Sequence, residues 1–123
     1  MNDLIIVVDL RKDRIRIHKN TLHALGDPSY VSLIINPDEY SLCIQCSSVD
    51  DKTAHHMRQR IMNSKSSYEL YSKSLVKAFL DLCPEWDSNT KYKLDGVLIP
   101  SEKMIKFSMK DAVWQDRRGG AKP

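Results

Sequence analysis

Five basic side chains near the start of the chain have the chemistry to hold phosphate groups. They are Arg11, Lys12, Arg14, Arg16 and Lys19. Successive side chains of a strand point to opposite faces, so Arg14 and Arg16 share one face while Ile15 and Ile17 share the other. Guanidinium groups form paired hydrogen bonds with phosphates and guanine edges. The spacing therefore predicts a face that contacts duplex DNA.

The same run has a second interpretation. Asp9 and Asp13 lie within or beside it and neutralise part of its positive charge. Alternating charges along a strand are also common on an outer face that meets only water. The net charge of the whole chain, +3, is mild and implies no polyanionic partner by itself. The sequence leaves both interpretations open.

A second group of residues has the chemistry of metal ligands. Cys43, Cys46, His55 and His56 include thiols and imidazoles, which zinc prefers. Cys43 falls in an expected strand, however, where a spacing of three sends the two thiols to opposite faces. We therefore predict no metal site, although the sequence does not decide whether these four residues bind one.

Trp86 lies in an expected loop between Glu85 and Asp87. An exposed tryptophan on a loop is a common anchor of protein interfaces, and nearby carboxylates can imitate phosphates. These three residues are the candidate contact surface for a protein partner. Trp86 has a second interpretation, in which it folds back over the sheet.

No arrangement of residues predicts catalysis. The four glycines are isolated or lie in the tail, so they form no phosphate-binding loop. The four histidines allow many accidental pairs with nucleophiles, and none stands out. We expect a protein that is not an enzyme and that needs no cofactor.

Length and composition are those of one globular domain. The chain has 123 residues, of which 28% are charged and 41% hydrophobic. Three cysteines, an odd number, favour free thiols in a reducing compartment. The longest apolar run, residues 4–8, is too short to span a membrane, so we expect a cytoplasmic location and no membrane partner.

The elements that would position these residues form one motif that occurs twice. A strand, a helix and a hairpin occupy residues 15–44, and the same order returns at residues 68–107. Neither unit is long enough to bury its apolar face alone. We therefore predict an α+β fold in which two β-α-β-β units form a single-domain pseudo-dimer around a mostly antiparallel sheet. The chain itself is then a monomeric pseudo-dimer or a homodimer.

The boundaries expected from this pattern are unit one at residues 1–46, a linker or surface excursion at 47–67, unit two at 68–114 and a flexible basic tail at 115–123. The role of the excursion is open, and a short helix is expected at 50–61 within it.

Four local features are also predicted. The β-branched run at residues 4–8 is typical of a central strand that is covered on both sides. Asn20 or Thr21 caps a short helix that ends at Gly26. A second helix occupies residues 72–82. Gly96, inside a strand, indicates a bulge or a close backbone approach.

Residues 8–45 resemble the AbrB and MraZ type of swapped-hairpin transcription regulators. The resemblance rests on the acidic Asp9, the turn, Arg14, the alternating strand and a short helix that closes at Leu25-Gly26. A degenerate second copy covers residues 68–107. The chain departs from the family pattern at Asp13, where a turn glycine is usual, and at His18, where proline is usual.

The resemblance implies a DNA-binding module of bacterial or phage type, in which arginines of the first loop and strand reach a duplex. The predicted function is a small DNA-binding regulator that uses the basic loop and strand of the first unit. The alternative is a protein-interaction module of a mobile element, for example an inhibitor that occupies a host nuclease or another nucleic-acid enzyme.

Overall fold

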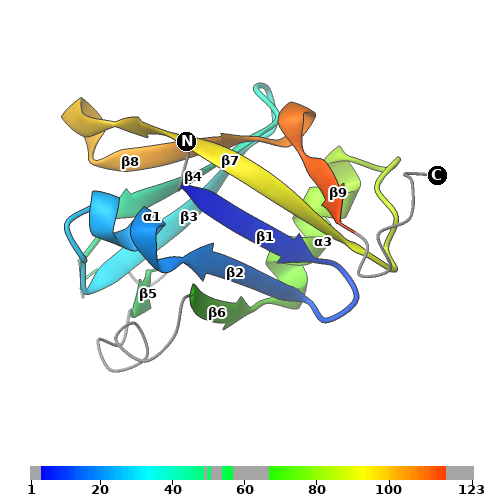
Figure 1. Cartoon of the computed structure of the whole chain (residues 1–123), viewed down its shortest axis with the longest axis horizontal. Helices are drawn as coiled ribbons and strands as arrows, with labels where there is room; N and C mark the ends of the chain where they lie inside the picture. The colour runs from blue at the N-terminus through cyan, green and yellow to red at the C-terminus, as the bar shows by residue number, and fades with distance from the viewer. Residues whose placement is uncertain (1–3, 49, 51–53, 57–66, 116–123) are drawn as a thin grey trace.

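The structure is a computed structural model that describes residues 4–48, 50, 54–56 and 67–115. The strands are β1 (Ile5–Asp9), β2 (Arg14–His18), β3 (Tyr30–Asn36), β4 (Ser41–Cys46), β5 (His55–His56), β6 (Ser67–Tyr71), β7 (Lys91–Ile99), β8 (Met104–Ser108) and β9 (Val113–Gln115). The helices are α1 (Lys19–Ala24) and α3 (Lys73–Leu82), with short 3-10 turns η1 (Pro100–Glu102) and η2 (Met109–Asp111). The predicted α+β class is confirmed (Figure 1).

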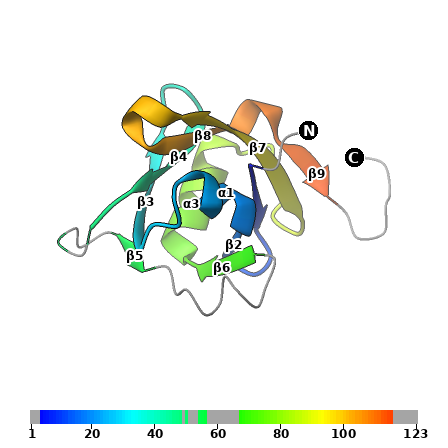
Figure 2. The same ribbon diagram turned by 60° about the vertical axis from the view of Figure 1, so that its left-hand side comes forward.

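The described strands join in one antiparallel order, β5-β3-β4-β8-β7-β1-β2-β6, and β9 adds to β7. β7 is long enough that β1 (Ile5–Asp9) pairs with its first half along one edge, while β8 pairs with its second half along the other edge. The sheet curls strongly, so that β5 and β6, at the two ends of this order, lie near each other (Figure 2). We call the part made of β9, β7, β1, β2 and β6 the first sheet, and the part made of β7, β8, β4, β3 and β5 the second sheet.

The core lies inside this curl. Alternate residues of the strands point inward and are fully buried, among them Ile6, Ile15, Ile44 and Phe107. The two helices approach opposite ends of the curled sheet, α1 near one end and α3 toward the other (Figures 1 and 2). Both helices contribute to the core. Both α1 and α3 therefore bury apolar side chains against the sheet.

Gly96 lies where β7 leaves the first sheet for the second. A Cβ at this position would lie 2.6 Å from Ile105 Cγ2 and 2.6 Å from Phe107 Cε2. The close backbone approach expected from a glycine inside a strand is therefore confirmed. The absence of a side chain lets the core pack directly against the β7 backbone.

The strand at the start of the chain differs from its prediction. β1 is central in the strand order, as expected, and Ile6 and Val8 are fully buried. Ile5 and Val7, on the other face, are only half-buried. The continuous apolar run predicted cover on both sides, but the helices cover only the inner face of the curled sheet, so the outer face of β1 meets solvent.

The N-cap of α1 is also different from the one predicted. His18 occupies this position, and its Nδ1 accepts a hydrogen bond from the backbone N–H of Asn20 over 3.1 Å. Thr21 is buried and bonds instead to the backbone of Ile5, donating its hydroxyl to the carbonyl and accepting from the N–H. The capping prediction was wrong because the Thr21 hydroxyl bonds to the backbone of β1 and is therefore not used to cap α1.

The other local predictions are mostly met. The predicted second helix is present as α3, and Ser72, which was expected to be its first residue, is its N-cap and accepts a hydrogen bond from the N–H of Leu75. In the predicted hairpin, Asn36 accepts hydrogen bonds from the N–H groups of Asp38 and Glu39 in the β3–β4 turn. Where a helix was expected at 50–61, residues 55–56 form β5 and pair with β3, and most of the remainder lies outside the described residues.

Two further features concern the ends of the described chain. β9 was not predicted, and its last residue, Gln115, is the first of the expected flexible tail. The rest of that tail lies outside the described residues. No helix in the described part of the chain has the length and apolar character needed to cross a membrane.

Candidate nucleic-acid interface

Three adjacent strands bring basic side chains to the outer face of the first sheet. Val7 of β1 pairs with Arg16 of β2 on one side and with Lys93 of β7 on the other, and directly paired residues lie on the same face. Asp9 is likewise flanked by Arg14 and Lys91. We call this surface, with the β1–β2 turn, the basic face; its basic residues are Arg11, Lys12, Arg14, Arg16, Lys91 and Lys93.

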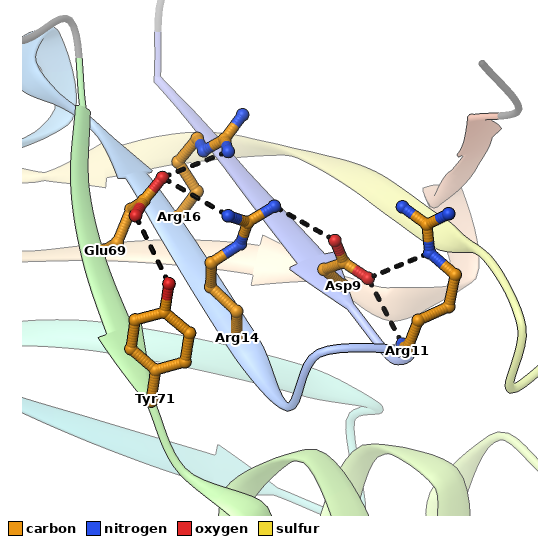
Figure 3. A network of polar contacts seen from close by, with 6 residues as sticks. All are labelled: Asp9, Arg11, Arg14, Arg16, Glu69 and Tyr71. Carbon is orange, nitrogen blue, oxygen red and sulfur yellow. Dashed lines mark hydrogen bonds and ion pairs between the residues drawn. The ribbon is translucent and has the colours of Figure 1, made fainter.

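A network of ion pairs holds the arginines of this face (Figure 3). Arg14 lies at its centre, with Nη2 3.0 Å from Asp9 Oδ2 and Nη1 3.4 Å from Glu69 Oε2. Arg16 Nη2 lies 3.0 Å from the same Glu69 oxygen. Arg11 contacts Asp9 Oδ1 through its backbone N–H at 3.1 Å and through Nε at 3.4 Å. Two carboxylates thus orient three guanidinium groups.

Asp9 is buried beneath these arginines, with only 1% of its side chain exposed. Burial raises the pKa of its carboxyl, but the hydrogen bonds and charge of Arg11 and the charge of Arg14 outweigh that effect, so the pKa lies below its ordinary value. The carboxylate is therefore ionised throughout the neutral pH range. It provides a fixed negative charge that accepts hydrogen bonds from the β1–β2 turn.

The predicted basic residues differ in what they can reach. The Arg14 side chain is only 11% exposed, whereas those of Arg11 and Arg16 are each 36% exposed. Lys12 is exposed in the turn, and Lys19 is half-buried as the first residue of α1. The structure therefore brings Arg11, Arg14 and Arg16 together and makes Arg14 the most covered of the three.

Two basic residues of this face were missed by the sequence analysis. Lys91 and Lys93 alternate along β7 and so share its outer face. Lys93 is 33% exposed, and its Nζ lies 3.9 Å from Asp95 Oδ1. Their alternation was a signal of a shared face, but nothing in the sequence showed that β7 lies beside β1.

Trp86 does not form the exposed anchor that the alternative function required. It is 8% exposed and stacks on Tyr92 at 4.3 Å and on Phe79 at 5.9 Å between ring centroids. Glu85 and Asp87 are exposed beside it. The indole packs against α3 and β7 because burying its apolar surface there is more favourable than leaving the ring exposed to water.

The cysteines point to different surroundings. Cys46 Sγ lies 3.4 Å from the carbonyl oxygen of Leu25, to which it donates, while Cys43 pairs across the second sheet with Lys106 on its outer face. The alternation of β4 thus separates the two thiols, as expected from their spacing. Within the described residues, no three His, Cys, Asp or Glu side chains are grouped to hold a metal ion.

Cys83 is buried in the core, where its Sγ lies 3.8 Å from Met109 Sδ. Burial, together with the charge of Glu85, raises the pKa of its thiol to about 11. A thiol with this pKa is protonated at neutral pH and is a poor nucleophile. It therefore serves as an apolar core residue.

Comparison with known proteins adds no relative to this description. The chain matches no family model, no curated protein and no solved structure.

Proposed function

We propose that this protein is a small cytoplasmic regulator that binds duplex DNA through the basic face. The observation that carries the proposal is the convergence of six basic side chains from β7, β1, β2 and the β1–β2 turn on one surface. Among the described residues, this surface carries four carboxylates: Asp9, Asp13, Glu69 and Asp95. The excess of positive charge favours a polyanion, and a continuous strand face suits the repeated phosphates of a duplex.

The ion pairs give the three arginines different roles. Arg14, bridged between Asp9 and Glu69, is a positioning residue that ties β1, β2 and β6 together. Arg11 and Arg16 each keep part of their guanidinium at the surface. Preorganised guanidinium groups lose little conformational entropy when they meet a phosphate. In this proposal the protein has no catalytic role and needs no cofactor.

Backbone geometry supports the resemblance to the swapped-hairpin regulators at the two positions that depart from it. Asp13 has φ 51°, the left-handed conformation that a turn glycine would favour. His18 has φ −62°, the value that proline imposes. The residue types differ from the family pattern, whereas the backbone conformations are those its usual residues prefer.

The first test removes two lysine charges of the basic face. The double variant Lys12→Gln/Lys93→Gln should bind labelled duplex DNA at least about tenfold more weakly at low salt, and its slope of log affinity against log salt concentration should fall by about two, because each lost phosphate contact releases about one fewer counterion. Fluorescence anisotropy from about 50 to 200 mM salt measures both quantities.

The matched control changes net charge equally on other surfaces. Lys77 pairs with Asp81 on α3, and Lys110 lies over the ring of Tyr40. Lys77→Gln/Lys110→Gln should keep the wild-type slope. If both double variants lost the same amount of DNA affinity, the effect would come from net charge and not from the basic face. If the wild-type protein bound no duplex at about 50 mM salt, the proposal would be refuted.

We also propose that the two β-α-β-β units are related by an approximate two-fold axis. When such an axis passes between two antiparallel strands, the two residues that pair at the middle of the ladder occupy equivalent positions in the two units. Cys43 and Lys106 form the middle pair of the β4–β8 ladder, and they are separated by the same number of residues as Pro37 and Pro100, which begin the two hairpin turns.

The backbone and the strand order support the same relation. Tyr40 and Lys103, which end the two turns, each have φ 51°. If β2 is exchanged with β6, β3 with β7, β4 with β8 and β1 with β5, each neighbouring pair in the order β5-β3-β4-β8-β7-β1-β2-β6 becomes another neighbouring pair of that order. The one exception is β1–β2, which becomes β5–β6, the two ends of the order. Arg16 and Glu69 are the middle pair of the β2–β6 ladder.

One observation favours the alternative function, a protein-interaction module of a mobile element such as an inhibitor of a host nuclease. Ile34 and Val97 are 46% and 67% exposed, and they stand at the two ends of a row across the second sheet that also contains Cys43 and Lys106. Exposed β-branched side chains aligned on a sheet suit a protein partner. This alternative uses the outer face of the second sheet rather than Trp86.

A further inference from the structure

A hollow of about 210 Å³ opens on the outer face of the first sheet at one end of the basic face. Its floor is apolar, made by Ile5 and Val7 of β1, and its polar lining consists of Arg16 and His18 of β2 and Ser67 of β6. The pairs Val7–Arg16 and His18–Ser67 place these groups directly beside one another. The half-buried outer side of β1 is thus the base of a lined depression.

Arg16 has hydrogen-bonding capacity that the fold does not use. Its Nη2 contacts Glu69 over 3.0 Å, while its Nε is enclosed and meets no acceptor among the described residues. A buried donor without an acceptor is unfavourable, because the hydrogen bond that it would make to water is not replaced. A guanidinium that turns slightly toward the hollow would offer several N–H groups to acceptor oxygens there.

His18 adds a directed donor. Its Nδ1 accepts the hydrogen bond from the Asn20 N–H, which places the proton of the neutral imidazole on Nε2. The ring is held in this orientation because the same hydrogen bond caps α1. Nε2–H is then a donor on a residue that lines the hollow, and the Ser67 hydroxyl supplies another.

We propose that this hollow is a subsite for one phosphodiester unit of the DNA backbone, with the phosphate oxygens on Arg16, His18 and Ser67 and the deoxyribose on Ile5 and Val7. Arginine and hydroxyl groups are common donors to backbone phosphates, and the apolar floor distinguishes a sugar-phosphate from a bare anion. Lys93, opposite Val7, continues the positive surface toward the next phosphates. The inference rests on the proposed DNA-binding function and assigns one of its contacts.

The test uses two variants with different expected signatures. Arg16→Gln removes a charge, so the affinity for a duplex should fall at least about fivefold and the salt slope by about one. His18→Asn keeps a side-chain oxygen that can cap α1 but removes the Nε2 donor. Its affinity should fall about threefold with an unchanged salt slope, because no counterion is involved. The matched control is His23→Asn, an exposed histidine of α1, which should bind as the wild type does.

Fluorescence anisotropy of the full chain measures these affinities, and the NMR signals of the His18 imidazole should shift on addition of duplex. If the wild type binds, Lys12→Gln/Lys93→Gln binds weakly and both hollow variants bind normally, the subsite is refuted while the DNA-binding function stands. If the wild type binds no duplex, both proposals fail.

Inorganic phosphate at constant ionic strength distinguishes the source of the phosphate group. For a phosphodiester subsite, it should displace duplex weakly and move the imidazole signals less than duplex does. The proposal would be overturned if the His18 imidazole signals responded to inorganic phosphate alone and both variants bound DNA as the wild type does. The hollow would then be a site for free phosphate.

Discussion

Asp9 shows how one residue can organise a surface. It follows an apolar strand and precedes a basic turn, and the structure buries it under Arg11 and Arg14. A buried carboxylate that satisfies two guanidinium groups is costly to remove, because the arginines are then left without their partner. The basic face therefore depends on an acidic residue for its geometry.

Asp9→Asn should lower the free energy of unfolding at pH 7 by about 1–3 kcal/mol, since it removes charge-assisted hydrogen bonds to both arginines. The pKa of Asp9 is lower in the folded chain than in the unfolded chain. Its stabilisation is therefore complete above the unfolded value of about 3.9 and is lost as the pH falls through the folded value.

Urea denaturation at pH 7 and at pH 2–4 checks this expectation. The wild type should lose more stability on acidification than Asp9→Asn does. Asp81→Asn, at an exposed pair with Lys77, is the control and should change stability by less than about 0.5 kcal/mol. A fully stable Asp9→Asn variant at pH 7 would show that the ion pairs add nothing to the fold.

At the scale of elements, the decisive feature is the continuity of β7 through both sheets. Its first half lies beside β1 and carries Lys91 and Lys93, while its second half lies beside β8. The change of neighbour falls at Gly96, where Ile105 and Phe107 pack against the backbone. One strand thus positions the basic face and also closes the core.

Gly96→Ala should destabilise the protein by about 1–3 kcal/mol, because the new methyl group would overlap two core side chains and force the strand or the core to shift. Gly26→Ala is the informative comparison, since Gly26 has φ 84° and no atom within 4 Å of a Cβ built there. It should cost about 1–2 kcal/mol through backbone strain alone.

Thermal denaturation gives both values, and methyl NMR signals of Ile105 separate the two causes. They should shift in Gly96→Ala and stay in place in Gly26→Ala. A Gly96→Ala variant that is as stable as the wild type, with unchanged Ile105 signals, would contradict the tight packing at the change of neighbour.

At the scale of the whole molecule, the proposed two-fold relation is open to direct measurement. In an experimentally determined structure, the β3–β4 hairpin superposed on the β7–β8 hairpin should require a rotation close to a half-turn. The same rotation should carry β2 onto β6. A rotation far from a half-turn, or one that leaves β2 away from β6, would refute the pseudo-dimer.

Several elements could be predicted from the sequence because their causes are local. The alternation in β2, the first hairpin, the helix at residues 72–82 and the close approach at Gly96 each depend on residues within a few positions of one another or on a missing side chain. The cap of α1 and the burial of the outer face of β1 were predicted less well. His18 displaced Asn20 and Thr21 as the cap of α1, since Thr21 was needed by β1.

The sequence by itself determined which residues share a face of each strand, and it thereby placed Arg14 and Arg16 side by side. Only the tertiary structure decided what faces them, because strand periodicity carries no information about the neighbouring strand. Glu69 reaches both arginines from β6, and Lys93 joins them from β7. Core packing selects these neighbours, since each strand must bury its apolar side in the same interior. The basic face, its carboxylate partners and its hollow are consequences of that choice.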